Sequence, residues 1–184
     1  RFHAQTAGST LVAVQPLNNV VRTTVEAMAA VLGGAQSLHT NAFDEALALP
    51  TEASAKLALR TQQVLAHESG LGDVVDPFGG SYAIEALTVE IDSRASALIA
   101  HIDDLGGMVA AIGAGYPQRE IERRAYEFQR AVEDKRRLIV GQNAFCDDES
   151  GAAPPVHHLD PAVEKTQCLR LARFRASRDG SASA

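Results

Sequence analysis

The sequence has few of the residues and runs that define small secreted, metal-binding or membrane proteins. Only two cysteines occur among 184 residues, Cys146 and Cys168, and nothing near them has the spacing of a zinc site or a disulfide framework. We therefore predict no metal site in this chain and expect reduced thiols in a cytoplasmic protein. No apolar run approaches the roughly 20 residues that a membrane span requires.

A surplus of positive charge is also missing. The net charge is −6, and proteins that bind nucleic acid gather Lys and Arg to meet the phosphates. The densest basic run, residues 119–137, alternates with Glu and Asp. This pattern is typical of a solvated helix face, so we expect neither a nucleic-acid nor a membrane partner.

What is present is a strand and helix alternation over the first half of the chain. Residues 1–7 and 35–40 have extended patterns, and helices are predicted over 20–32 and 52–69. Thr51 is placed to cap the second helix, and Asn18-Asn19 offers a cap for the first. Apolar residues repeat along the first helix at spacings of three and four: Val21, Val25, Met28 and Leu32.

The second half of the chain changes character. Residues 83–105 and 118–137 are predicted as long amphipathic helices separated by glycines. Residues 146–184 are rich in Pro, Asp, Ser and Ala, with one possible helix at 161–175. We divide the chain into strands and helices (1–82), a helical extension (83–145) and a mostly irregular tail (146–184).

The order of these elements predicts an α/β fold with parallel strands. At 184 residues and 46% apolar content the chain is long enough for one domain with a core. Two or three parallel strands cannot close a barrel, however, and would leave both edges unpaired. The first residue is Arg1, already inside a predicted strand, so we expect the true beginning of the protein to lie upstream.

Polar side chains on the two strands are the first candidates for chemistry. His3 and Gln5 share a face of one strand, and the second carries Gln36, Ser37 and His39. A parallel barrel is normally filled by Val, Ile and Leu. These side chains therefore point either into a ligand-filled bore or to strand ends, where they bond neighbouring backbone.

The loop after the second strand is the next candidate. In residues 41–45 a carboxylate can accept hydrogen bonds from ribose hydroxyls, because loops after strands build the active face of βα barrels, or it can cap the following helical turn. Asn41 and Asp44 have the spacing of a capping box, and capping is the role that spacing favours.

Three long segments carry a resemblance to a known family: RFHAQTAGSTL, QPLNNVVRTTVEAMAAVLGGAQSLHTNAFDEALALPTE and RTQQVLAHESGLGDVVDPFGGSYAIEALT. They resemble the large, substrate-binding subunit of the methylmalonyl-CoA mutase family, in its C-terminal portion. The later YPQREIERRAYEFQRAVEDKRRLIVGQNAF is similar to the helical extension of that family. The resemblance is strong over residues 1–145 and looser over 154–179.

This resemblance implies the last part of a (β/α)8 TIM barrel followed by a helical extension, and hence an incomplete barrel. It implies an adenosylcobalamin-dependent acyl-CoA mutase, an isomerase that interconverts methylmalonyl-CoA and succinyl-CoA by radical chemistry. Isobutyryl-CoA or 2-hydroxyisobutyryl-CoA are the alternative substrates. A non-catalytic remnant that acts only as a partner subunit is the alternative to an enzyme, and the chain alone is expected to be inactive.

The resemblance also assigns roles by position. It implies substrate and adenosyl contacts for His3 and Gln5, contacts to the CoA thioester arm for Gln36 and Ser37, ribose contacts for Asn41 and Glu45, and packing against the corrin for Gly8 and Ala48.

The cobalt ligand is not among these residues. The ligand motif of cobalamin proteins is Asp-x-His-x-x-Gly, and the segment around His67 carries Leu65 where the Asp belongs. We expect a separate cobalamin-binding domain or small subunit to supply the ligand. The expected partners are therefore that unit, the remainder of the barrel and an acyl-CoA.

Overall fold

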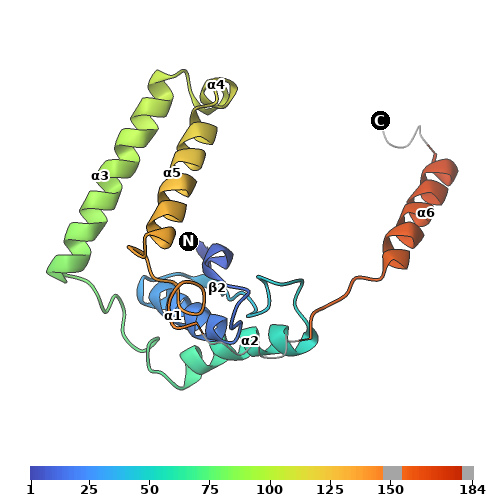
Figure 1. Cartoon of the computed structure of the whole chain (residues 1–184), viewed down its shortest axis with the longest axis horizontal. Helices are drawn as coiled ribbons and strands as arrows, with labels where there is room; N and C mark the ends of the chain where they lie inside the picture. The colour runs from blue at the N-terminus through green and yellow to red at the C-terminus, as the bar shows by residue number, and fades with distance from the viewer. Residues whose placement is uncertain (147–154, 180–184) are drawn as a thin grey trace.

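A small parallel sheet and a set of helices make up the molecule. The computed structural model describes residues 1–146 and 155–179 (Figure 1). β1 (His3–Gln5) and β2 (Ser37–His39) pair in parallel, with His3 opposite Ser37 and Gln5 opposite His39. The strands lie within the predicted ranges but are shorter than predicted.

The connection between the strands makes a β-α-β unit. A short 3-10 turn, η1 (Gly8–Thr10), follows β1, and α1 (Asn18–Leu32) leads to β2. The capping prediction at Asn18-Asn19 is wrong, because the helix is capped by Leu17 without a side-chain hydrogen bond. Asn19 is instead fully buried inside the first turn.

The buried face of α1 is formed by small and polar side chains. Asn19, Thr23 and Ala27 are buried, whereas Val21 and Val25 are 64% and 54% exposed. Small side chains let α1 approach β2 and α2 closely, since large residues at those positions would hold the backbones apart. The larger side chains of Val21, Val25 and Met28 face outward.

The second helix follows its prediction closely. α2 (Glu52–His67) begins where the sequence indicates, and the Thr51 hydroxyl accepts a hydrogen bond of 3.2 Å from the Ser54 N–H. α2 is tied to β2 by the Gln62 amide, which donates to the Leu38 carbonyl, and by the Thr40 hydroxyl, which donates to the Ala58 carbonyl.

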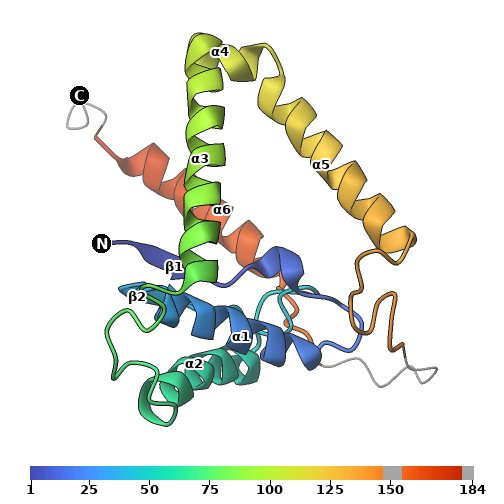
Figure 2. The same cartoon turned by 90° about the vertical axis from the view of Figure 1, so that its left-hand side faces the viewer.

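The helical extension is an arm of three helices: α3 (Tyr82–Asp104), α4 (Met108–Gly113) and α5 (Tyr116–Glu133) (Figure 2). The short α4 was not predicted. On α5 the basic and acidic side chains pair along one surface, where Arg123 contacts Glu120 and Glu127 at 2.6 Å each. The prediction of a solvated helix face is confirmed, and the structure adds these ion pairs.

The last helix, α6 (Pro161–Ser177), stands apart from the rest in Figure 1. It begins with the Asp160 carboxylate accepting from the Ala162 N–H at 2.9 Å. The helix expected at 161–175 is therefore present. The remainder of the expected irregular tail falls partly on residues 147–154 and 180–184, outside the described residues.

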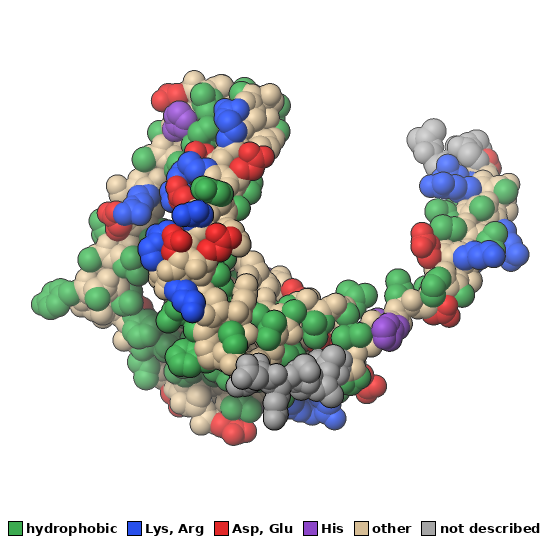
Figure 3. Space-filling view, in the orientation of Figure 1, with side chains coloured by type: hydrophobic (Ala, Val, Ile, Leu, Met, Phe, Trp, Pro, Cys, Tyr) green, Lys and Arg blue, Asp and Glu red, His purple; other side chains and the backbone are tan. Residues whose placement is uncertain are grey.

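The accessible surface is far larger than that of a compact monomer. It is 13862 Å², against about 8,500 Å² for a compact chain of 19.5 kDa. Large apolar side chains are spread over the outside of the helices (Figure 3), with Tyr82 and Val109 96% and 87% exposed. Among the described residues few apolar side chains are buried, so these residues do not form the single core that the length allows. No helix in the described ranges is long and apolar enough to cross a bilayer.

Candidate functional site

One face of the two-stranded sheet is polar and open. Alternation along each strand places His3 and Gln5 of β1 and Ser37 and His39 of β2 on this face, and all four are exposed. Ala4 and Leu38 point to the other side and are half-buried. The polar side chains thus form one surface two residues wide.

At the beginning of the strands, side chains of β1 bond to the segment that enters β2. The His3 Nδ1 atom lies 2.7 Å from the Ser37 hydroxyl. The Gln36 Oε1 atom accepts from the Phe2 N–H at 2.8 Å, and its Nε2 donates to the Gly34 carbonyl at 2.6 Å. His3, Gln36 and Ser37 therefore lie together, and Gln36 helps to hold the two strands in register.

At the carboxyl end of the strands, Asn41 is the central polar group. Its Oδ1 accepts from the Gln5 amide at 3.2 Å and from the Thr6 hydroxyl at 3.1 Å. Its backbone N–H donates to the Thr6 hydroxyl at 2.9 Å. The buried Asn41 Nδ2 has no hydrogen-bond partner among the described residues.

Gly8 lies against the Glu45 carboxylate and the unpaired Asn41 amide nitrogen. A Cβ at Gly8 would lie 2.5 Å from Glu45 Oε1 and 2.9 Å from Asn41 Nδ2, so a side chain there would displace one of them. A carboxylate oxygen and an unpaired amide N–H therefore face one small space. Ala48 is half-buried, and its N–H donates to the Asp44 carbonyl.

The capping-box prediction for Asn41 and Asp44 is wrong. Asn41 bonds back to β1, as described, and Asp44 is buried with its Oδ2 accepting from the Thr51 N–H at 3.2 Å. Asp44 thus fixes the end of the loop before α2. The side chain of Asn41 is free of any capping role and is turned toward Gln5 and Gly8.

His39, a candidate from the strand pattern to which the resemblance assigns no role, belongs to the same surface. It lines a hollow of about 200 Å³ together with Glu45, Thr40 and Gln62. The signal in the sequence is its spacing of two from Ser37, which puts both on one strand face.

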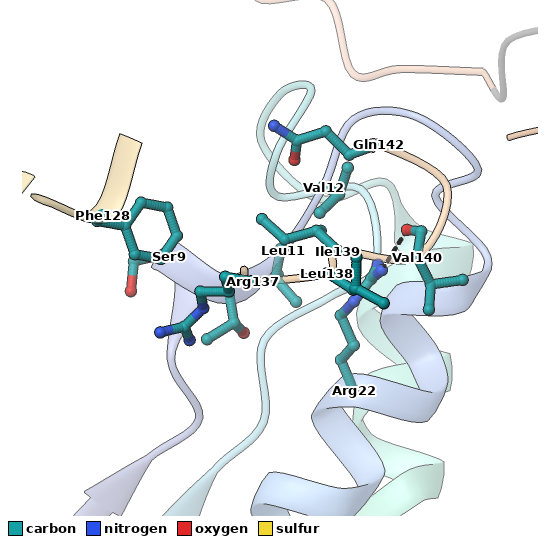
Figure 4. Close-up of a pocket in the computed structure, with 11 residues that line it drawn as sticks. Ser9, Leu11, Val12, Arg22, Phe128, Arg137, Leu138, Ile139, Val140 and Gln142 are labelled. Carbon is teal, nitrogen blue, oxygen red and sulfur yellow. Dashed lines mark hydrogen bonds between the residues drawn. The ribbon is translucent and has the colours of Figure 1, made fainter. Parts of the chain in front are cut away.

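A larger hollow of about 700 Å³ lies beside the loop that follows Gly8 (Figure 4). Its walls are that loop, Arg22 of α1 and the segment after α5. Arg137 stacks on Phe128, with the guanidinium carbon 4.8 Å from the ring centre. None of the predicted site residues lines this hollow.

The described residues gather no group of three or more His, Cys, Asp or Glu side chains in a metal-binding arrangement. Cys146 and Cys168 are free and exposed.

Comparison with known proteins identifies the class to which this fold and surface belong. The model of the family described as methylmalonyl-CoA mutase matches residues 1–184, and the chain belongs to that family.

Particular relatives cover nearly all of the chain. It is 47% identical over 182 residues to a protein of Escherichia coli (strain K12) named methylmalonyl-CoA mutase, covering 99% of this chain and 26% of the relative. It is 45% identical over 179 residues to the 2-hydroxyisobutanoyl-CoA mutase large subunit of Aquincola tertiaricarbonis, covering 97% and 32%. Mitochondrial methylmalonyl-CoA mutase of Mus musculus is 42% identical over 179 residues, covering 97% and 24%. The chain thus spans about a quarter to a third of the length of these relatives.

Proposed function

We propose that this chain is the C-terminal portion of the substrate-binding barrel of an adenosylcobalamin-dependent acyl-CoA mutase, an isomerase that rearranges a carbon skeleton. The observation that carries the proposal is the cluster of Gln5, Gly8, Asn41 and Glu45 at one end of a polar sheet face. Family membership supports the same class of reaction.

The residues present suit the adenosyl group of the cofactor. A ribose hydroxyl both donates and accepts hydrogen bonds, and here Glu45 offers an acceptor while Asn41 Nδ2 offers an unused donor. Because Gly8 has no side chain, both groups can lie against its Cα. When bound, the cofactor supplies radical chemistry, and the task of this chain is to hold the adenosyl end in place.

The other end of the face suits a thioester arm. Ser37 and Gln36 offer hydroxyl and amide groups, and His3 lies against Ser37, so a polar chain laid along the face passes from these groups to Gln5. We propose that the acyl-CoA lies along this path and that His3 and Gln5 contact the reacting part. A water-poor bore would keep a reactive intermediate from side reactions.

The partners follow from the exposed surface. We propose that the remainder of a (β/α)8 barrel covers the free sheet edges and the outward face of α1. A separate cobalamin-binding domain or small subunit would supply the cobalt ligand. We propose methylmalonyl-CoA as the substrate, with isobutyryl-CoA or 2-hydroxyisobutyryl-CoA as the alternatives; relatives named for methylmalonyl-CoA and for 2-hydroxyisobutanoyl-CoA are similar to this chain to nearly the same degree.

Glu45→Gln in the full-length subunit tests the cofactor site. The change keeps the size of the side chain and removes the charge, so we expect adenosylcobalamin affinity to fall about tenfold or more, since hydrogen bonds to charged groups contribute about 1.5–3 kcal/mol. Titration of the cofactor, followed by absorbance, measures this. Glu52→Gln, on the exposed first turn of α2, is the matched control. Equal affinity in both variants would refute the cofactor assignment.

A further inference from the structure

The loops that carry the proposed cofactor contacts are irregular and need something to fix them. One follows β1 and contains Gly8, and the other follows β2 and contains Asn41 and Glu45. Side chains on such loops hold a useful geometry only when their own backbone is supported. The residue that joins both loops is Asn19, in the first turn of α1.

Asn19 is fully buried and forms hydrogen bonds to both loops. Its Oδ1 accepts from the Val12 N–H at 3.0 Å, and its Nδ2 donates to the Val12 carbonyl at 2.8 Å. The same Nδ2 donates to the Phe43 carbonyl at 2.8 Å. Val12 lies four residues after Gly8, and Phe43 lies between Asn41 and Glu45.

Arg22 joins Asn19 to the segment after α5. One of its nitrogens donates to Asn19 Oδ1 at 2.7 Å, and another donates to the Val140 carbonyl at 2.7 Å. Figure 4 shows this arginine reaching from α1 to Val140. Gly141, with φ +81, lies so close to Gln15 that a Cβ there would be 2.9 Å from Gln15 Oε1. The Arg22–Val140 hydrogen bond therefore ties the segment after α5 to α1.

The chemistry of Asn19 leaves no hydrogen-bonding capacity unused. An amide side chain has two acceptor positions and two donor hydrogens, and all four are occupied. Aspartate would lose both donors and face two carbonyl oxygens, and leucine would lose every bond. No other side chain of the same length supplies this pattern.

We propose that Asn19 is a positioning residue for the cofactor site: it holds the Gly8 loop and the Asn41–Glu45 loop at a fixed separation, and Arg22 extends the support to the segment after α5. The inference rests on the proposed function, because it concerns the same site. The acyl-CoA contacts at Gln36 and Ser37 lie at the other end of the strands and do not depend on this residue.

Asn19→Asp in the full-length subunit, assayed with its cobalamin-binding unit, tests the inference. We expect adenosylcobalamin affinity to fall about tenfold to a hundredfold, as for other residues that orient ligating groups. The dissociation constant of the acyl-CoA should change less than that of the cofactor, because its proposed contacts at Gln36 and Ser37 lie at the other end of the strands. Hydrogen exchange should rise at residues 8–12 and 41–45 in the folded protein.

Asn18→Asp is the matched control. This neighbour on the same helical turn makes one local bond, from its amide to Gln15 Oε1 at 2.8 Å, so its substitution should leave both affinities unchanged. If Asn19→Asp fails to fold, Arg22→Lys decides. The lysine keeps the positive charge but lacks the planar guanidinium whose two nitrogens bond Asn19 and Val140. We again expect cofactor affinity to fall without an equal loss of acyl-CoA affinity.

Two results would overturn the inference: unchanged cofactor affinity, or equal losses for the cofactor and the acyl-CoA, which indicate a merely structural role. The Glu45→Gln variant separates this inference from the proposed function. A loss in Glu45→Gln without a loss in the Asn19 and Arg22 variants refutes the positioning role alone. No loss in Glu45→Gln refutes the cofactor site itself.

Discussion

At the scale of single residues, Gln36 has two competing roles. Its side chain bonds the Phe2 N–H and the Gly34 carbonyl, and it lies at the edge of the face proposed to bind the CoA thioester arm. The acceptor bond joins the segments that enter the two strands, and the donor bond is local to the turn before β2. The oxygen of an amide has a second lone pair, so a ligand contact is still possible alongside the strand bond.

Gln36→Leu separates these roles. We predict weaker productive binding of the acyl-CoA by about 1–3 kcal/mol, because a buried polar group of the ligand would lose its partner, with little change in the melting temperature. KM and thermal unfolding of the full-length subunit measure the two effects. Ser54→Ala, at the capped start of α2, is a reference for a purely structural loss. A fall in melting temperature without a change in KM would assign Gln36 to strand pairing only.

The residues that lie together at the site could be predicted where strand period and loop position determine their placement. Gln5, Gly8, Asn41 and Glu45 do come together, since all four follow or end parallel strands. The role of Asn19 was not predictable. An Asn at a helix start is typical of a cap, and only tertiary packing shows that its side chain instead bonds two loops.

At the scale of elements, local signals decided which helices were predicted well. α2 has a threonine cap and follows its predicted range, because the first orphan N–H groups are satisfied by a side chain close in sequence. α4 is six residues between glycines, too short for a period of 3.6 to show. The buried face of α1 could not be predicted from its apolar spacing, because that spacing does not indicate which element covers the helix.

The two strands allow a prediction for the isolated chain. β1 and β2 pair only with each other among the described strands, so each keeps one open edge. We predict rapid hydrogen exchange at residues 2–6 and 36–40 in residues 1–184 alone, or aggregation through these edges. The same amides should be protected in the full-length subunit. Strong protection in an isolated monomer would show that the chain is a self-sufficient domain.

At the scale of the whole molecule, the large exposed apolar surface is the main physical constraint. About 25 cal/mol is gained for each Å² of apolar surface removed from water, so faces such as that of Val21 and Val25 are stabilised by whatever covers them. The chain corresponds to about a quarter to a third of its relatives. We therefore propose that turnover belongs to the assembled protein, to which this chain contributes the substrate and cofactor contacts described above.

The most direct test of that account is turnover by the full-length large subunit with its cobalamin-binding unit. Methylmalonyl-CoA, isobutyryl-CoA and 2-hydroxyisobutyryl-CoA are supplied in turn, with and without adenosylcobalamin, and products are separated by mass spectrometry and chromatography. We predict that one of these thioesters is converted to its carbon-skeleton isomer only when the cofactor is present. A folded, cofactor-saturated protein that isomerises none of them, or that does so equally without adenosylcobalamin, would contradict the account.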